Sequence, residues 1–472
     1  MRVGEGMLSN GAAASEVSAT VLRITSSSGL RNVSIEVTFN EVSLSYLADE
    51  LSIPFTRIRA AGARVHDYAR LSAFERITAG YIAGELTLEE ARQQAIQVPQ
   101  AKPHYPLSLV AAGFAVLGGG AALGLGAGTL VMVAATIAGA ILILLAELLG
   151  RRRIPLFYTQ AVGGFVGVVT AVVVSLIDPS VNSSIVVVAS IMVLLAGLTS
   201  IGAMQDAVTG WYITASGRIL ETLMLTVGLV AGVRGGLLLA DALGAEIAVS
   251  AALPVSLASV VVLAVSGAAI GLGYAVGCHV PASQLPWMAA VAAGSSVVAH
   301  ILGGFMHDRV FSVATTALLV GVGAVFLGDR FRTPALMYVM GGVIPLVPGL
   351  RIYRGLLALG DDVSTGAVEL FGAAEIAIGI AAGAVLGQLL ASRVIRSTRR
   401  IGVAHIPVIS APFTTLRRRR ASIGPGWRRR RGQGLVVEPS TMTGEMTALS
   451  PSMLEELEHA SGRRPADPEE SP

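Results

Sequence analysis

Ten long apolar stretches follow one another behind residue 106, and they constrain the fold of this chain more than any other feature. Most are close to the ~20 residues that a helix needs to cross ~30 Å of hydrocarbon. Because lipid offers no hydrogen bonds, such stretches must satisfy their backbone groups within helices. The stretches are 107–127, 129–149, 157–177, 184–204, 219–239, 254–276, 285–306, 310–328, 335–350 and 367–391. The sequence therefore predicts an α-helical polytopic membrane protein with about ten transmembrane helices.

Composition supports this fold class and excludes several kinds of site. Only 14% of the residues are charged, whereas an average soluble domain has about 25%. Cys278 is the only cysteine, so no internal disulfide and no thiolate metal cluster can form. Lys102 is the only lysine, which excludes a phosphate-binding loop with its obligatory lysine. We expect no cofactor, and ATP-driven transport would need a separate subunit.

Residues 1–104 have mixed polarity and predict a small N-terminal α+β domain. Because its charge is nearly balanced, no nucleic-acid partner is expected. Apolar residues recur at helical spacing from Gly4 to Ser27. The remaining predicted elements are strands at Val33–Phe39, Val42–Leu47 and Phe55–Ala60 and helices at Asp67–Gly84 and Thr87–Gln97, the last opening with a capping box of Thr87 and Glu90.

The arginines predict the orientation in the membrane. Arg151–Arg153, Arg330 and Arg332 and the arginines behind residue 392 all fall on one side if ten helices are counted. Basic loops stay in the cytoplasm, so both termini are predicted there, in a multi-pass inner (plasma) membrane protein. Three arginines depart from this pattern, Arg309, Arg351 and Arg354.

The chain from residue 393 to 472 is of low complexity, first Arg-rich and then acidic. This composition predicts a disordered cytoplasmic tail. Its arginine clusters either dock on anionic lipid or merely fix the topology.

The ten stretches divide into two sets of five that resemble each other, over residues 105–250 and 251–392. The matching pieces are Gly197–Gly210 with Gly342–Gly355, Gly228 and Gly232 with Gly379 and Gly383, and Gly113–Gly119 with Gly267–Gly273. Repeats with an odd number of spans insert in opposite orientations. The sequence therefore predicts a 5+5 inverted repeat, the plan of many secondary transporters, with substrate bound near the midplane between the halves.

Polar side chains in or beside the apolar stretches are candidates for substrate binding or coupling, because each costs about 2.5–3.5 kcal/mol to insert, and the Pro-Gly break of the ninth stretch is added to them. The candidates are Gln205, Asp206, Arg218, Glu221, His300, Pro345, Pro348, Gly349, Arg351, Glu369 and Glu375. A free amino acid presents an ammonium and a carboxylate. Glu221 or Asp206 can meet the first, and Arg218 or Arg351 the second. A carboxylate at this depth also suits proton coupling.

Two local interpretations of these candidates stay open. Arg218 and Glu221 lie one turn apart, so they either bind substrate or only neutralise each other at the interface. His300 is either a proton relay or a buried histidine with ordinary hydrogen bonds. Pro345, Pro348 and Gly349 cannot all sit in a regular helix, which predicts a break whose freed carbonyls face protein or a water-filled cavity.

Several of these residues also carry a family resemblance. Those in the fifth stretch and the loop before it are Gln205-Asp206-Ala207, Thr209-Gly210, Thr214-Ala215, Arg218, Glu221, Thr226 and Gly228. Others are Asn10-Gly11-Ala12 with Val17, Gly113-Phe114-Ala115, Gly118-Gly119-Gly120 and Pro348-Gly349-Leu350. Over roughly residues 4–392 the chain resembles the threonine/serine exporter family of actinobacterial type. The resemblance implies export of threonine and serine driven by the proton motive force, by a cytoplasmic N-domain joined to about ten spans.

The leading hypothesis is thus a secondary exporter of small polar amino acids rather than an enzyme, with threonine, serine, protons and the lipid bilayer as partners. Another small acid or a dipeptide is the alternative cargo. A membrane-tethered hydrolase acting through residues 1–104 is the alternative from another class. The residue types for that chemistry are present in Ser15, Glu16, Ser18, His66 and Asp67, but their spacing matches no hydrolase motif. A homo-oligomer is compatible with the sequence.

Overall fold

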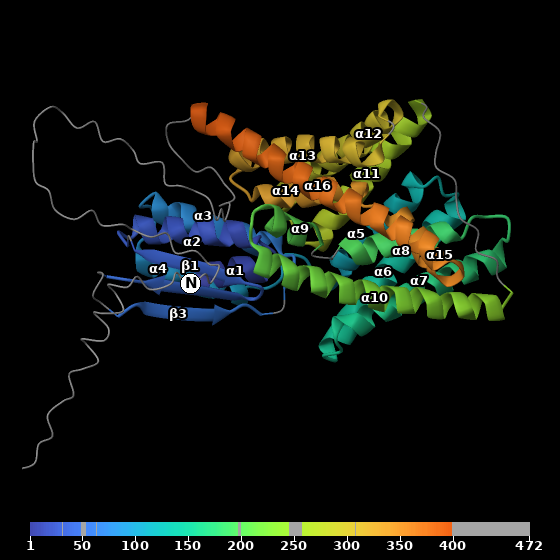
Figure 1. The fold of residues 1–472 in the computed structure, drawn as a ribbon, viewed down its shortest axis with the longest axis horizontal. Helices are drawn as coiled ribbons and strands as arrows, with labels where there is room; N and C mark the ends of the chain where they lie inside the picture. Colours follow the sequence, from blue (N-terminus) through green and yellow to red (C-terminus); the bar gives the residue numbers. More distant parts are fainter. Residues whose placement is uncertain are drawn as a thin grey trace, which may run out of the picture. The chain divides into compact units, whose positions relative to one another are not determined.

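The computed structural model describes residues 1–30, 32–48, 53–62, 64–196, 200–244, 257–306 and 308–398. Contacts divide the chain into two compact units, Met1–Ser410 and Ala411–Pro472. The second unit lies outside the described residues, and so does nearly all of the tail predicted over residues 393–472. Figure 1 shows the elements of the first unit, coloured from blue to orange along the chain.

The described part of residues 1–104, called here the N-terminal region, contains four α-helices, one short 3-10 helix and a three-stranded sheet (Figure 1). The elements are α1 (Arg2–Ser9), α2 (Ala14–Ser27), β1 (Val33–Thr38), β2 (Glu41–Tyr46), β3 (Phe55–Ala60), α3 (Tyr68–Ile82), α4 (Leu88–Gln97) and the short helix η1 (Val98–Gln100). The sheet is antiparallel in the order β1-β2-β3. All three predicted strands and both later helices are confirmed, as is the capping box of Thr87 and Glu90 at the start of α4.

The single helix predicted over Gly4–Ser27 is wrong, because α1 ends at Ser9 and α2 begins only at Ala14. The side chain of Asn10 donates a hydrogen bond to the carbonyl of Gly6 at 2.7 Å. Gly11 has a φ of 94°, a conformation that glycine adopts without a Cβ penalty. The chain therefore leaves the helix at Asn10 and Gly11 and re-enters one at Ala14.

Behind the N-terminal region the chain is helical. The helices are α5 (Leu107–Gly124), α6 (Thr129–Arg151), α7 (Leu156–Ile177), α8 (Ser184–Ala196), α9 (Ser200–Val208), α10 (Tyr212–Ala242), α11 (Leu257–Gly277), η2 (Ala282–Gln284), α12 (Leu285–Phe305), α13 (Arg309–Phe331), α14 (Ala335–Val343), η3 (Ile344–Leu346), α15 (Gly349–Asp361) and α16 (Val363–Thr398). Within the described residues, eight helices are long and apolar enough to cross a membrane, or nine if one bent pair is a single span. This is a multi-pass membrane protein.

Eight of the ten predicted stretches coincide with these long helices, and the other two, 335–350 and 184–204, do not. Stretch 335–350 bends by 50° between Ala335–Leu346 and Gly349–Gly355. Pro345 lies in η3 and Pro348 caps α15, so the break predicted from these prolines is present. Stretch 184–204 contains the short apolar helix α8 and the start of α9, with residues 197–199 outside the described part.

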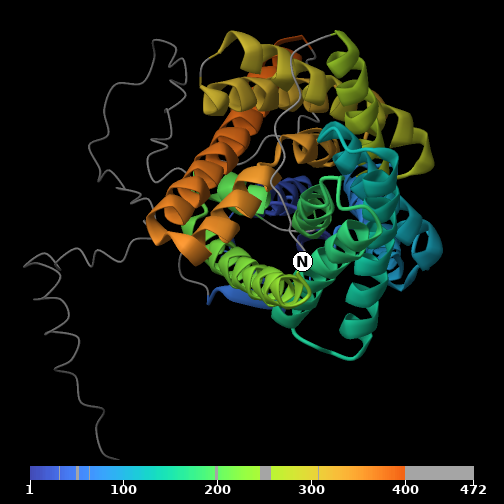
Figure 2. The same cartoon turned by 90° about the vertical axis from the view of Figure 1, so that its right-hand side faces the viewer.

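The same helix pairs pack together before and after residue 250. α7 packs along α10 as α13 packs along α16, and α5 packs on α6 as α11 packs on α12. α8 contacts α5, α6 and α7, and α14 contacts α11, α12 and α13. Figure 2 shows α11–α13 in yellow tones on one side and the teal and lime helices α6, α7 and α10 on the other.

Glycines allow the closest of these approaches. A Cβ built on Gly232 of α10 would lie 1.8 Å from the carbonyl oxygen of Ala161 in α7, and one on Gly383 of α16 would lie 2.1 Å from that of Ala314 in α13. α5 and α11 meet in the same way at Gly113 and Gly273. Farther along α5, Gly120 faces Ile270, which precedes Gly273 in α11, so the two helices run antiparallel.

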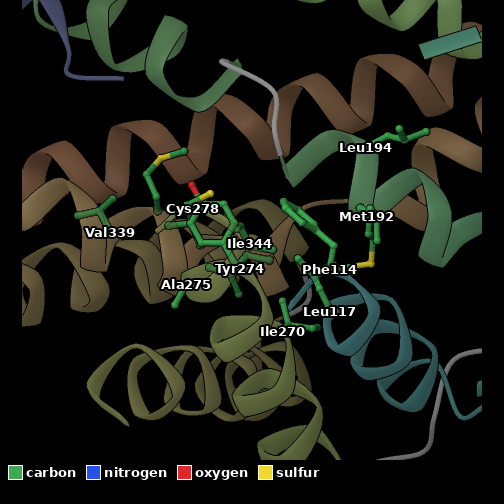
Figure 3. Close-up of a cluster of buried hydrophobic side chains, with 14 of the residues drawn as sticks. Phe114, Leu117, Met192, Leu194, Ile270, Tyr274, Ala275, Cys278, Val339 and Ile344 are labelled. Carbon is green, nitrogen blue, oxygen red and sulfur yellow. The ribbon is translucent and has the colours of Figure 1, made fainter. Parts of the chain in front are cut away.

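The core lies where the two sets of helices meet. Figure 3 shows side chains from α5, α8, α11 and η3 gathered in one cluster. Among its labelled members are Phe114, Leu117, Met192, Tyr274 and Ile344, all buried. This packing holds α8 and the bent segment α14–α15 between the long helices.

Candidate functional site

A buried ion pair between Asp206 of α9 and Arg218 of α10 is the centre of the site. The carboxylate of Asp206 is inaccessible to solvent, and the side chain of Arg218 is 2% exposed. Arg218 Nη1 donates a hydrogen bond to Asp206 Oδ2. The turn through Gly210, whose φ is 89°, reverses the chain between α9 and α10 and brings the two residues together. A buried charge is tolerated where it is paired in this way.

The N-terminal region completes the environment of this pair with backbone groups. The amide of Ala14 donates a hydrogen bond to Asp206 Oδ1 at 3.0 Å. Arg218 Nη2 donates one to the carbonyl oxygen of Ala12 at 3.2 Å. Ala14 is the first residue of α2, and a helix N-terminus favours a carboxylate through its free N–H groups and its dipole. The break between α1 and α2 therefore offers one donor and one acceptor to the pair.

Arg64 and His66 lie beside these groups, on the segment between β3 and α3. Arg64 Nη1 is 3.8 Å from Glu221 Oε2, while its Nη2 donates to the carbonyl of Phe39 at 3.1 Å. Burial, followed by the nearby Arg218 charge, lowers the pKa of Arg64 to about 10. Burial, with the charges of Arg64 and Arg218, lowers the pKa of His66 to about 4, so this imidazole is neutral at pH 7.

A small cavity joins the N-terminal region to both sets of helices at this point. Gln205, Arg218, Arg64, His66, Leu336 and Met340 are among the residues that line it. It offers about 10 Å³ of space to the centre of a water molecule, which is room for roughly one water. In this conformation the cavity is therefore closed to an amino acid.

Other contacts fix the N-terminal region on the helices. Thr214 Oγ1, one turn before Arg218, donates a hydrogen bond to the carbonyl of Val37 at 2.6 Å. On the other set of helices, the amide of Tyr68 donates to the carbonyl of Cys278 at 3.0 Å, and the hydroxyls of Tyr68 and Tyr274 lie 3.0 Å apart. The N-terminal region thus touches helices on both sides of residue 250.

A second group of candidates lies at the end of the helices away from the N-terminal region, around α15 and the start of α16 (Figure 1). Arg351 Nε is 3.7 Å from Glu369 Oε2, and the two side chains are 40% and 31% exposed. Gly349 begins α15 and packs against Met192 of α8.

Two candidates join neither group. His300 lies in α12, and its Nε2 is buried without a hydrogen-bond partner among the described residues. Glu375 is exposed on α16. Of the two interpretations left open for Arg218 and Glu221, mutual neutralisation is not observed, because Arg218 pairs with Asp206 and Glu221 faces Arg64. That Glu221 or Asp206 meets the ammonium of an amino acid, and Arg218 or Arg351 its carboxylate, stays a prediction.

Comparison with known proteins gives this arrangement a context. A family model described as "Putative threonine/serine exporter" matches residues 1–240, and a second, "Threonine/Serine exporter, ThrE", matches residues 262–390. The chain belongs to the threonine/serine exporter family. A "Probable threonine/serine exporter" of Mycobacterium tuberculosis is 31% identical over 414 residues, covering 85% of this chain and 77% of its own length. A "Threonine/serine exporter" of Corynebacterium glutamicum is 30% identical over 405 residues, covering 84% and 83%. No solved structure matches the chain.

Members of the exporter family are transporters, so this protein is not an enzyme. Of the residues considered for a hydrolase, His66 lines the cavity beside Arg218. Ser15 is buried in α2, and Asp67 caps α3 by accepting a hydrogen bond from the amide of Arg70 at 3.0 Å. Within the described ranges, no three His, Cys, Asp or Glu side chains are grouped as metal ligands.

The sequence did not indicate Ala12, Ala14 and Arg64 as parts of the site. Two of them contribute backbone atoms, which no side-chain pattern reveals, and all three lie more than 140 residues from Asp206 in the chain. The exporter-family resemblance included Asn10-Gly11-Ala12, and this motif forms the break that faces Arg218. In the sequence, this motif was the one indication that the N-terminal region contributes to the site.

Proposed function

We propose that this chain is a secondary exporter of threonine and serine in which Asp206 and Arg218 bind the two ends of the amino acid. One observation carries the proposal: the pair already holds a backbone N–H and a backbone carbonyl. Threonine presents an ammonium, a stronger donor than the backbone N–H, and a carboxylate, a stronger acceptor than the backbone carbonyl. Asp206 would take the ammonium and Arg218 the carboxylate.

In this mechanism the segment Ala12–Ala14 occupies the position of the substrate. The cavity beside it admits about one water, so the segment must withdraw before threonine can bind. Arg64 and Glu221 lie next to the pair and would line the opened entrance. Gln205 lines the same cavity and would bind the hydroxyl group that threonine and serine share.

Alternating access between two inverted halves, residues 105–250 and 251–392, would carry the amino acid across. The equivalent packing of α7 with α10 and of α13 with α16 supports a repeat, and the antiparallel run of α5 and α11 supports its inversion. The proposal counts ten crossings, with α8 and α9 in the fourth and the bent pair α14–α15 in the ninth.

Orientation and coupling complete the proposal. The N-terminal domain would face the cytoplasm of the plasma membrane, because the arginines of the loops at Arg151–Arg153 and Arg330–Arg332 lie on its side if ten crossings are counted. Protons would drive export, with Asp206 or Glu221 as the carboxylate that exchanges a proton with the cytoplasm.

The test is threonine transport by the purified chain in proteoliposomes, with an imposed pH gradient and membrane potential. Asp206→Asn should reduce transport at least tenfold. Asp241→Asn, on an exposed aspartate at the far end of α10, should not change it. Wild-type transport of threonine and serine that an excess of either suppresses would support the cargo. A wild-type protein that moves dipeptides or other acids but neither amino acid would overturn it.

A further inference from the structure

The ion pair Arg351–Glu369 occupies the place in the second half that Asp206–Arg218 occupies in the first. In the alignment of Gly197–Gly210 with Gly342–Gly355, Arg351 stands at the position of Asp206. Glu369 precedes Gly379 by ten residues, just as Arg218 precedes the equivalent Gly228. The two pairs are therefore equivalent in the repeat, with their charges exchanged.

The structure places the two pairs on equivalent elements. Asp206 lies on α9 and Arg218 on α10, and these helices pack together as α15 and α16 do. Arg218 is the seventh residue of α10, counted from Tyr212, and Glu369 is the seventh of α16, counted from Val363. Because the halves run in opposite directions, the pairs lie at opposite ends of the helices (Figure 1).

The pairs differ in how they are enclosed. Asp206 and Arg218 are 0% and 2% exposed, whereas Arg351 and Glu369 are 40% and 31% exposed. Glu369 Oε2 has no hydrogen-bond partner among the described residues. α9 packs extensively against α16 of the other half, and the described residues of α15 show no packing of that extent against α10. The first pair is enclosed, whereas the second lies at an end that is partly open.

The partly open end also gathers the arginines that the positive-inside pattern leaves unexplained. Arg309 starts α13, and the charges of Arg351 and Arg354 on α15 act on it. The guanidinium of Arg351 lies over Gly372, where an added Cβ would meet Nη1 at 2.2 Å, so the glycine makes room for it. Positive charge gathered in this way favours an anionic ligand group.

We propose that Arg351 and Glu369 form a second amino-acid site, on the side of the membrane opposite the N-terminal region. Arg351 binds the α-carboxylate with two parallel hydrogen bonds, and Glu369 binds the α-ammonium. This inference rests on the proposed function, because it takes the same substrate and assigns its exit. When the Asp206–Arg218 pair is closed, as here, the second site is the one that exchanges amino acid with the outside.

Threonine exchange in proteoliposomes of known orientation tests the two sites separately. Arg351→Gln should raise the half-saturating threonine concentration on the outer side by about 10- to 100-fold, the equivalent of a lost charged hydrogen-bond pair. The half-saturating concentration on the side of the N-terminal region should change less than about threefold. Arg234→Gln, on an exposed arginine of α10, is the matched control and should behave as wild type.

A second variant keeps the charges and moves only the guanidinium. Gly372→Ala places a methyl group where Arg351 lies and should raise the same outer constant. The charge exchange Arg351→Glu with Glu369→Arg should restore exchange above either single variant. Outer constants that stay at the wild-type value in both Arg351→Gln and Gly372→Ala would overturn the second site. If the wild type exchanges no threonine at all, the proposed function itself fails.

Discussion

Replacing Asp206 by asparagine removes one charge from the site and almost no volume. Asparagine can still accept a hydrogen bond from the amide of Ala14 or from Arg218, but it cannot neutralise the guanidinium. Arg218 would be left as an unpaired cation with 2% of its side chain exposed. Removing one partner of a pair this deeply buried costs about 3–5 kcal/mol.

The expected result is therefore a free energy of unfolding lower by about 3–5 kcal/mol, measured by equilibrium unfolding of the purified protein in mixed micelles. Asp241→Asn, which changes an exposed carboxylate in the same way, should stay within about 0.5 kcal/mol of wild type. The double variant Asp206→Asn with Arg218→Gln carries no unpaired charge. It should recover most of the loss, because removing both partners of a buried pair is often nearly neutral.

The coupling free energy between Asp206 and Arg218, obtained from the single and double variants, tests this reasoning. If the effects of Asp206→Asn and Arg218→Gln simply add in the double variant, the two side chains do not interact and the reasoning from their burial is refuted. A single variant as stable as wild type would refute it too.

Three further predictions concern backbone geometry and pH. Gly232→Ala should weaken the α7–α10 contact and lower the yield of folded protein on size exclusion. Gly235→Ala should not, because an added Cβ there would lie 3.8 Å from its nearest neighbour, Phe165. Gly11→Ala forces a left-handed φ on alanine at the break beside Arg218 and should destabilise the protein by about 1–2 kcal/mol in the same unfolding assay. Burial raises the pKa of Glu16, which shares a hydrogen bond with Glu75, to about 7. The folded protein therefore keeps a proton that the unfolded chain loses, and its stability declines as pH rises from the usual glutamate range through about 7. Glu16→Gln should remove the part of the decline that Glu16 causes, so the melting temperature of the variant relative to wild type should rise between pH 5 and pH 8. The same difference in melting temperature at both pH values would contradict the prediction.

Local patterns explain why most of the helices and strands could be predicted. A stretch of about 20 apolar residues has few alternatives to a membrane helix. The prolines at 345 and 348 also fixed the break in the ninth stretch, since a regular helix cannot contain them both. The break at Asn10–Ala13 was missed because the apolar spacing continues across it, and only the left-handed Gly11 interrupts the helix.

The composition of the site was less predictable because its contacts are distant in sequence. Helical spacing suggested Glu221 as the partner of Arg218, three residues away. Asp206 pairs with Arg218 instead, because the Gly210 turn folds α9 back onto α10 and buries the carboxylate of Asp206, whereas Glu221 remains 31% exposed. The contacts from Ala12 and Ala14 depend on how the N-terminal region packs on the helices, which no local pattern encodes.

The arginines that broke the positive-inside pattern show a similar limit. Arg309, Arg351 and Arg354 were separate exceptions in the sequence, yet the structure brings them near one another at one end of the helices. A topology rule weighs each charge by its loop and cannot show that three exceptions share a location.

The central claim is that Asp206 and Arg218 recognise the ammonium and the carboxylate of one amino acid. The most direct measurement is the binding of threonine, N-acetylthreonine and threonine methyl ester to the purified chain by calorimetry. Threonine should bind to the wild type, with both analogues at least tenfold weaker. Asp206→Asn should lose the preference over the acetylated analogue and Arg218→Gln the preference over the ester. A wild type that binds all three equally, or variants that keep both preferences, would contradict the claim.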